Sequence, residues 1–560
     1  MGAKLLLFPT FFSKPYFMIF RTLTMLWLSA IASACWSQSG LPKPLQKPLA
    51  QVSAEAIKAH IAYLADDRMK GRLPGTPEFD LAGKYVETQF QKLGLEPAGE
   101  NGGYRQKVVV RTAKIVAEQC RFHYHSTSQH MDLEYGKDFS VQPDFNAAQN
   151  RVEASLVFVG HGITAPKLNH DDYKGIDAQG KIVIVLSRVP ENKFGSTESA
   201  HLATTNAKVD MAYQHGAVGV LIMPAPTVGV PQGGGGSAKG VVFPNGKAEG
   251  WGVNPYPSIK LVGALTWTGL GKILGKTDLS SKELAALLYK PSAPVDIQGT
   301  LQTQTGTLYE ELETFNLVGK IPGSDPVLKE EYVVHTAHLD HVGIGRPVNG
   351  DSIYNGAHDN ASGVASLLEI ARVYQNLKKD RPKRSVLIVM VTGEEMGLLG
   401  STYFANNPTV PKDKIVADIN TDMPTILAPL LGVVPLGAEH STLMATVQQA
   451  AGYLGLEVMQ DHMPQEVRFV RSDQYSFVLQ GIPALHIKYG LKTQDPNFDL
   501  NGLIVDFTKN NYHKPSDELN GSFNFEAGCT YVRLNFLISY LVSRATERPS
   551  WKPESIFAKM

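Results

Sequence analysis

The stretch Ser385-Val-Leu-Ile-Val-Met-Val-Thr-Gly-Glu-Glu-Met396 is a continuous apolar run followed at once by two adjacent acidic residues. Such a run of branched apolar residues predicts a strand buried on both faces, which is typical of parallel sheets covered by helices. In these sheets, functional side chains lie beyond the carboxyl ends of the strands. Glu394 and Glu395 therefore stand where chemistry is expected.

Further segments place polar side chains at the ends of predicted strands. The run Tyr332–Ala337 predicts a strand that leads into His338-Leu-Asp-His341, and Lys414–Ile419 predicts a strand that leads into Asp422. A long amphipathic helix is predicted between these two strands, over 361–377. The alternation of strands and helices predicts an α/β fold with a mixed, mostly parallel sheet flanked by helices.

Imidazole and carboxylate groups gather along this predicted edge. The loop before the long helix adds Asp359, and a loop near the end of the chain adds His513. A single strand-end Asp is usually a turn residue, but several such groups at one edge would repel one another without a cation. Imidazole with carboxylate suits zinc, and an excess of carboxylate suits two metals that share one carboxylate.

The adjacent residues Glu394 and Glu395 are expected to have different roles. Neighbouring side chains diverge in direction, so one can bind metal while the other faces the metal-bound water as a general base. Spacing alone leaves open which residue does which.

The length of 560 residues predicts at least two domains. Composition shifts over 151–300, where runs such as Lys181–Leu186 predict buried strands but His, Asp and Glu form no tight cluster. The predicted division consists of a signal peptide (1–34), the two parts of one main domain (50–150 and 305–545, the second with the metal site), and an inserted domain (151–300).

Charge and cysteine content exclude several classes of protein. Lys and Arg together number 53, and so do Asp and Glu together, which gives a formal net charge of zero. The sequence has no basic stripe either, and both features argue against nucleic acid as a partner. Three cysteines are too few for a disulfide scaffold. Cys120 and Cys529 are expected to be separate buried thiols.

The first residues are typical of an export signal. Basic residues precede the apolar run Leu23–Ile31, and Ala32-Ser-Ala34 fits a signal-peptidase site. The protein is therefore expected to be periplasmic or secreted. A lipoprotein cut before Cys35, which would tether the chain to a membrane, is the alternative. No later segment is apolar enough to span a bilayer, and residues 41–48 are predicted to be a Pro/Lys linker.

Five runs together resemble the secreted co-catalytic zinc aminopeptidases, whose superfamily also holds glutamate carboxypeptidase, glutaminyl cyclase and the transferrin receptor. The runs are AHLDH (337–341), GAHDNASGVASLLEIAR (356–372), TGEEMGLLGS (392–401), INTDM (419–423) and YHKPSDE (512–518). They stand in the family's order, and the resemblance covers nearly all of the chain after the signal. It implies the zinc exopeptidase fold with a β-rich protease-associated domain inserted at about 151–300.

The resemblance implies two zinc ions per chain. Their ligands would be five residues: His338, Asp359, Glu395, Asp422 and His513. Asp359 would bridge the two ions. His338 and Asp422 would complete the first site, and Glu395 and His513 would complete the second.

Further roles are implied for residues beside these ligands. Glu394 would be the general base, and Tyr512 would help to stabilise the oxyanion. Asp340 would accept the ring N–H of His338 and so fix its tautomer. The peptide bond that follows residue 359 would be cis.

Two other histidines, His335 and His341, flank His338. Residues three apart on a strand point to opposite faces, so both are expected to lie outside the metal shell. Arg471 or Arg468 would contact substrate, but a surface salt bridge explains either residue equally well.

The implied activity is that of a zinc-dependent exopeptidase. The first interpretation is an aminopeptidase that removes N-terminal residues of peptides outside the cytoplasm through a zinc-bridged water. A carboxypeptidase or dipeptidase on the same scaffold is the main alternative, because pocket residues decide the direction of attack. Glutaminyl cyclase is disfavoured by the inserted block, and a non-catalytic receptor-like relative is disfavoured because every ligand position is filled.

Overall fold

The computed structural model describes four stretches of the chain: 40–224, 236–288, 295–519 and 521–558. Contacts between residues group Pro42–Met560 as one compact unit. The predicted signal peptide (1–34) and Cys35 lie outside the described residues. Within those residues, every helix is too short or too polar to cross a lipid bilayer.

Four parallel strands form the centre of the main sheet. Their order is β18 (Ser385–Val391), β15 (Tyr332–His338), β19 (Ile415–Asn420) and β22 (Ala484–Tyr489). Every residue of the first three strands is buried, as their continuous apolar runs predict. Antiparallel strands border the four: β14 (Val295–Ile321) lies beside β18, and β20 (Gly432–Leu436) lies beside β22. The predicted mixed, mostly parallel sheet is confirmed.

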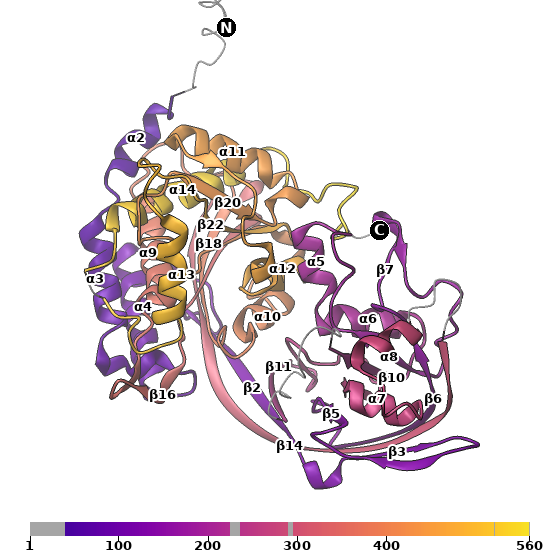
Figure 1. Cartoon of the computed structure of the whole chain (residues 1–560). Helices are drawn as coiled ribbons and strands as arrows, with labels where there is room; N and C mark the ends of the chain where they lie inside the picture. Colours follow the sequence, from indigo (N-terminus) through magenta and orange to yellow (C-terminus); the bar gives the residue numbers. More distant parts are fainter. Residues whose placement is uncertain (1–39, 225–235, 289–294, 520, 559–560) are drawn as a thin grey trace, which may run out of the picture. The chain divides into compact units, whose positions relative to one another are not determined.

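Helices cover both faces of this sheet (Figure 1). On one side, α9 (Ser362–Gln375) contacts α3 (Ala54–Leu64) and α14 (Phe525–Arg544), and α9 and α14 both contact β15. On the other side, α10 (Leu399–Asn406) packs against α12 (Gln474–Leu479), which contacts β19 and β22. Residues beyond the carboxyl ends of the parallel strands therefore lie at the edge of a layered core.

Helix α3 shows how local sequence sets an element. Ser53 caps its first turn by accepting a hydrogen bond from the backbone N–H of Ala56 at 3.1 Å. Ile57, Ile61 and Leu64 then recur on one face, and all three are buried. The cap and the apolar spacing together account for this helix.

Strand β14 is shared by two sheets. Its second half pairs with β2 (Arg105–Ile115) and then with β18, and its first half pairs with β3 (Arg121–His125) and β6 (Gln149–Phe158). The second sheet adds five strands: β4 (His130–Leu133), β5 (Phe139–Val141), β9 (Ile182–Leu186), β10 (Gly219–Met223) and β13 (Leu261–Leu265). Its strand order is β4, β3, β14, β6, β9, β10, β13, β5. Strands from before residue 151 thus join the block at 151–300, whose assignment as a protease-associated domain stays a prediction.

The linker predicted at 41–48 is wrong. Helix α2 occupies Lys43–Ala50, with a proline in its first turn, where no backbone donor is needed. Leu45 and Leu49, four residues apart, are buried on one face of the helix. The linker prediction rests on the Pro and Lys content and takes no account of the spacing of the two leucines. Cys120 and Cys529 are buried, free thiols within the described part of the chain, as expected.

Candidate active site

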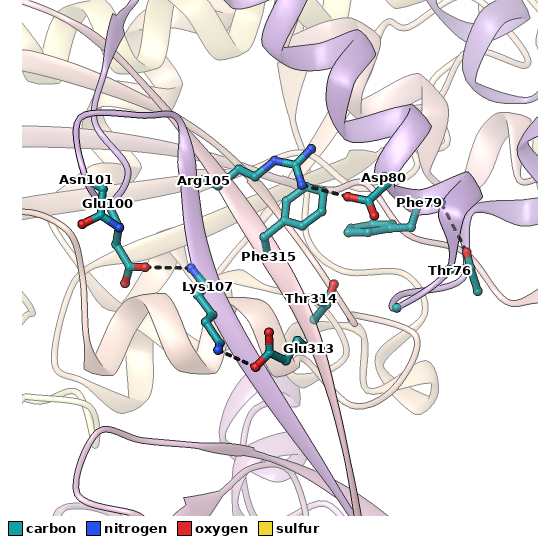
Figure 2. Close-up of a pocket in the computed structure, with 11 residues that line it drawn as sticks. Thr76, Phe79, Asp80, Glu100, Asn101, Arg105, Lys107, Glu313, Thr314 and Phe315 are labelled. Carbon is teal, nitrogen blue, oxygen red and sulfur yellow. Dashed lines mark hydrogen bonds and ion pairs between the residues drawn. The ribbon is translucent and has the colours of Figure 1, made fainter.

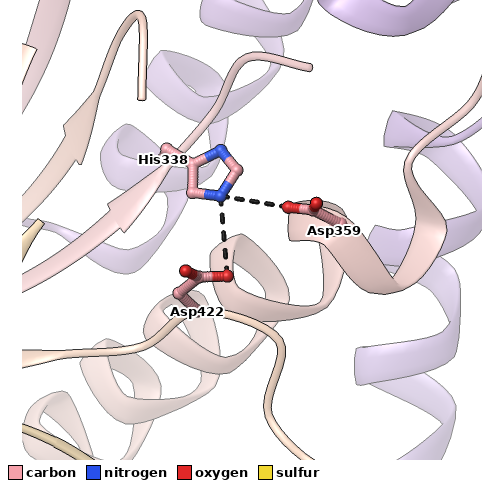
Figure 3. A group of neighbouring side chains, drawn as sticks. All are labelled: His338, Asp359 and Asp422. Atoms are coloured by element: carbon pink, nitrogen blue, oxygen red, sulfur yellow. Dashed lines mark ion pairs between the residues drawn. The ribbon is translucent and has the colours of Figure 1, made fainter. Parts of the chain in front are cut away.

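The carboxyl ends of the parallel strands bring the first group of candidate residues together. His338 is the last residue of β15, and Asp422 follows the end of β19. His338 Nε2 lies 3.2 Å from Asp359 Oδ1 and 3.6 Å from Asp422 Oδ1. Figure 3 shows the three side chains converging on one point. Their ligand atoms lie close enough together to hold one metal ion.

The second group forms on the other side of Asp359. His513 Nε2 lies 3.1 Å from Asp359 Oδ2 and 3.0 Å from Glu395 Oε2. The two carboxylate oxygens of Asp359 therefore face two different histidines from distant parts of the chain. This arrangement matches the geometry expected of a bridging carboxylate.

His341 lies next to the second group of candidate ligands. β15 ends at His338, so the alternation of strand faces does not extend to residue 341. His341 Nδ1 lies 2.6 Å from Glu395 Oε1, and the two residues form a potential metal-binding group with Asp359. His341 thus contacts a candidate ligand, and its expected place outside the metal shell stays a prediction. Its contact with Glu395 fixes the orientation of that carboxylate.

Asp340 acts on its neighbours in a different way from the one expected. The ring Nδ1 of His338 lies 3.1 Å from the backbone carbonyl oxygen of Asp340, whereas its carboxylate is 3.9 Å away. That carboxylate instead accepts the backbone N–H groups of Glu394 and Glu395, at 3.2 and 3.3 Å. Donation from Nδ1 to the carbonyl still leaves Nε2 of a neutral ring free to bind metal.

The loop that carries Asp359 is held by a buried carboxylate. Asp517 accepts the backbone N–H of His358 at 2.9 Å and that of Asp359 at 3.0 Å. The peptide bond between Asp359 and Asn360 is cis, as the resemblance implied. Asn360 is also tied to the end of β19, because its side-chain amide donates to the carbonyl of Thr421.

Asp422 is held by residues that follow it in the sequence. Ser472 Oγ donates to Asp422 Oδ2 at 2.6 Å. His486 Nε2 and Lys488 Nζ both donate to the backbone carbonyl of Asp422, each at 2.9 Å. Both Asp359 and Asp422 are therefore fixed in place by contacts outside the candidate ligand set.

The charges of the two groups favour a bound cation. Burial lowers the pKa of His338, but contact with Asp359 and Asp422 outweighs burial and raises it well above its usual value. Burial also lowers the pKa of His513, yet its acidic partners Asp359 and Glu395 raise it to about 10. Within the described residues, three of the converging atoms are buried without a hydrogen-bond partner: His338 Nε2, Asp422 Oδ1 and His513 Nε2. These residues fit a divalent metal with nitrogen and oxygen ligands.

Glu394 lies in the same cluster with a different electrostatic character. Burial raises its pKa well above its usual value, and the neighbouring carboxylates of Asp422 and Glu395 add to this, against the effect of His338. A carboxyl group that gains a proton readily suits general acid–base chemistry.

A pocket of about 370 Å³ opens beside Asp422, and Tyr512 and Arg471 both line it. The ring of Tyr512 stacks on that of His513, with centroids 3.9 Å apart. Arg471 Nη2 reaches the Tyr512 hydroxyl at 3.5 Å, and its side chain is 48% exposed. The structure thus places both residues in the wall of a pocket that Asp422 also lines.

Arg72 holds together the backbone segments that carry the site. It is fully buried, and its guanidinium donates to four backbone carbonyls: Leu64 at 2.5 Å, Asn355 at 2.7 Å, Leu339 at 2.8 Å and Gly356 at 3.0 Å. These bonds join the end of α3 to the segments that precede Asp340 and Asp359. Gly71 makes the approach possible, because a Cβ there would lie 2.4 Å from the carbonyl oxygen of Tyr354.

We expect Arg72→Met to lower the free energy of unfolding by roughly 3 kcal/mol or more, because several buried carbonyls would lose their donor. Arg68→Met is the matched control: the Arg68 side chain is 70% exposed and forms an ion pair with Asp66 at the surface. Urea unfolding of the two variants measures the difference. Equal stabilities would contradict the structural role of Arg72.

A second cavity, of about 400 Å³, lies between α4 (Pro77–Leu93) and strands β2 and β14 (Figure 2). Its charges are paired: Arg105 bonds to Asp80 at 2.8 Å, and Lys107 forms an ion pair with Glu313. The Arg105 guanidinium also lies 3.9 Å above the ring of Phe315. The described lining contains none of the predicted site residues, so this cavity is a solvent-facing ion-pair network.

Part of the chain is similar to known proteins. Residues 316–524, which hold all five candidate ligands, match the profile of peptidase family M28. This segment of the chain is therefore similar to the members of peptidase family M28. The M28 segment also includes Glu394, Asp340, Tyr512 and Arg471.

Individual relatives match over part of their length. A probable zinc metalloprotease of Pyrenophora tritici-repentis is 32% identical over 172 residues, which are 28% of this chain and 34% of the relative. A probable leucine aminopeptidase 2 of Aspergillus fumigatus is 28% identical over 274 residues, which are 44% and 50% of the two chains. The chain thus spans about a third to a half of the length of these curated relatives. Among solved structures, an aminopeptidase from Aneurinibacillus sp. strain AM-1 aligns with 20% identity and a TM-score of 0.46, covering 91% of this chain and 98% of that one.

Proposed function

We propose that this protein is a zinc-dependent exopeptidase, an aminopeptidase that removes N-terminal residues from peptides. The observation that carries the proposal is the position of Asp359, whose two oxygens face His338 and His513 from opposite sides. The match of residues 316–524 to peptidase family M28 supports peptide-bond hydrolysis. The names of the fungal relatives support zinc and action at the amino end.

We assign two zinc ions to the chain. His338 and Asp422 would hold one, Glu395 and His513 would hold the other, and Asp359 would contribute one oxygen to each. When bound, such ions polarise a scissile carbonyl and make water a better nucleophile at neutral pH.

The chain's own residues supply the proton transfers. Glu394, whose pKa is raised by burial and by neighbouring carboxylates, would accept a proton from the attacking water and pass it to the leaving amine. The Tyr512 hydroxyl lies at the mouth of the pocket, where it would donate a hydrogen bond to the developing oxyanion. Arg471, which reaches that hydroxyl, would orient it.

The direction of attack is tested with two peptides that differ at one end. A dipeptide amide with a free amino group should be cleaved by zinc-loaded protein, and its N-acetylated counterpart should not. The acidic groups of the site favour an α-ammonium, which acetylation removes. Comparable or faster cleavage of the acetylated peptide would overturn the aminopeptidase assignment and leave a zinc hydrolase.

Binding of zinc should release protons, because zinc takes neutral imidazole. The pKa of His338 is raised well above its usual value and that of His513 is raised to about 10, so both rings are protonated in the metal-free site at pH 7. The apparent affinity of each ion should therefore rise about tenfold per pH unit from pH 6 to 8. Titration calorimetry in buffers of different ionisation enthalpy measures the release. A pH-independent affinity would contradict the ligation by histidine.

A carboxypeptidase on the same scaffold is the second candidate. The observation in its favour is the pocket beside Asp422, where Arg468, Arg471 and Lys488 offer positive charge for a free carboxylate. Glutaminyl cyclase and a receptor-like role have no comparable support. All five candidate ligands are present, which a receptor without metals would not require.

We also propose that the protein acts outside the cytoplasm. The basic and apolar pattern of residues 1–34 supports export, with a lipid on Cys35 as the alternative processing. Mass spectrometry of the mature amino terminus distinguishes a cut after Ala34 from a lipidated cysteine. An uncut amino terminus would contradict both forms.

A further inference from the structure

The pocket beside Asp422 combines an apolar wall with an excess of positive charge. Its apolar lining includes Met423, Leu427, Tyr489, Ile504 and Phe507. Its charged lining consists of four basic residues, Arg468, Arg471, Lys488 and Lys509, and two acidic residues, Asp422 and Glu466. Because Asp422 is a candidate metal ligand, its charge would be taken up by the ion. In the form that acts on substrate, the basic residues of the lining would therefore outnumber its one remaining acidic residue, Glu466.

Arg468 is held in the wall of this pocket with donors to spare. Its side chain is 10% exposed, and its Nη2 forms an ion pair with Asp461. Nε and Nη1 are buried, and neither has a hydrogen-bond partner in the described part of the chain. The guanidinium also lies 5.7 Å from the ring centroid of Tyr489, which limits its movement. Buried donors without a partner are rare in folded proteins, and a ligand that supplies an acceptor relieves the cost.

Lys488 stands where the pocket meets the candidate metal centre. Its Nζ donates to the backbone carbonyl of Asp422 at 2.9 Å, which uses one of the three N–H donors of the ammonium group. Lys488 and Arg468 line the same pocket from different segments, β22 and the turn at Arg468–Val470. A group bound between them would be adjacent to the scissile bond.

We propose that this pocket receives a carboxylate of the substrate, bound by Arg468 and Lys488. This inference rests on the proposed function and narrows its substrate class. The carboxylate has two sources: the side chain of an N-terminal Asp or Glu, or the free α-carboxylate of a short peptide. The apolar wall would contact the methylene groups that carry it. An uncharged apolar side chain would leave the buried donors unsatisfied.

Two isosteric substrates test the side-chain source. The p-nitroanilides of Glu and Gln differ by one charge and share their shape, and Leu p-nitroanilide serves as an apolar reference. With zinc-loaded protein, we expect kcat/KM for Glu to exceed that for Gln by roughly 10- to 100-fold, the range of a charge-assisted hydrogen bond. The ratio is measured on one preparation, so it does not depend on the active fraction.

Matched variants assign the preference to the pocket. Lys488→Met should reduce the Glu/Gln ratio at least tenfold, and Arg468→Met should reduce it in the same direction. The Asp422 carbonyl keeps a donor in Lys488→Met, because His486 Nε2 also bonds to it at 2.9 Å. Lys492→Met is the control: it removes the same charge from an exposed lysine that pairs with Glu457, and the ratio should not change.

A second pair of substrates tests the α-carboxylate source. Ala-Ala and Ala-Ala amide differ only in the charge at the carboxyl end. If the free acid is preferred and Lys488→Met removes that preference, the pocket binds the α-carboxylate. A Glu preference that Lys488→Met removes shows instead that the pocket binds the side chain.

The outcomes separate this inference from the proposed function. Cleavage of Leu and Gln substrates as fast as the Glu substrate, together with equal rates on both dipeptides, would overturn the carboxylate pocket and leave the peptidase. A charge preference that survives in both Lys488→Met and Arg468→Met would also overturn it. Failure to cleave any of these peptides with zinc bound would overturn the proposed function, and the inference with it.

Discussion

Glu394→Gln should lower kcat by roughly 10²- to 10⁴-fold while the protein keeps its fold and its metal, because a positioned acid–base group contributes about that much. Glutamine has the shape of glutamate but cannot accept the proton of the attacking water. Glu394 lies beside Asp422 and Glu395 with a raised pKa, as expected of a carboxyl group that carries a proton between steps. Steady-state kinetics with elemental analysis of the same sample measures both quantities.

The adjacent variant Glu395→Gln is the control for this prediction. Glu395 contacts His513 at 3.0 Å and His341 at 2.6 Å, within the second candidate metal group. Its substitution should weaken the binding of one ion rather than the proton transfer alone. If Glu394→Gln lost a zinc ion while Glu395→Gln kept both, the two roles would have to be exchanged.

Asp359→Ala should leave the chain without tightly bound zinc, and activity should fall to the level of the chelated parent. The variant removes one ligand from each ion at once, since Oδ1 faces His338 and Oδ2 faces His513. Elemental analysis after gel filtration measures the loss, and circular dichroism checks the fold.

Asp413→Ala is the matched control for this loss of metal. Asp413 is 77% exposed and lies outside both metal groups, so its removal should leave metal content unchanged. An Asp359→Ala protein that kept two tightly bound ions would exclude the bridging role.

Much of the fold follows from local pattern. The apolar run Ser385–Val391 is a strand with those same bounds, and Ser53 caps the start of a helix. Both signals are short-range: burial requires a continuous apolar run in a covered sheet, and a cap requires one side chain near free N–H groups. Local pattern gave a wrong prediction at Lys43–Ala50. The Pro and Lys residues there indicated a linker, but two buried leucines fix α2 to the core.

The candidate site was predictable in its residue types and less so in its contacts. The polar residues at strand ends converge as expected, because parallel strands end at a common edge. Strand alternation could not predict the contact of His341 with Glu395, because β15 ends at His338. The Asp340 carboxylate bonds to the backbone of Glu394 and Glu395 rather than to the imidazole of His338, a choice that depends on how the loop after β18 folds back.

The amino-acid sequence was sufficient to establish the α/β class, the strand ends that carry chemistry and the acidic and imidazole groups gathered there. Periodicity and strand ends are local properties, so they can be interpreted without a fold. The fold alone decided that Arg468 and Lys488 line one pocket beside Asp422, and that two buried donors of Arg468 have no hydrogen-bond partner among the described residues. Burial and hydrogen bonding depend on which distant segments meet, and no spacing along the chain specifies that.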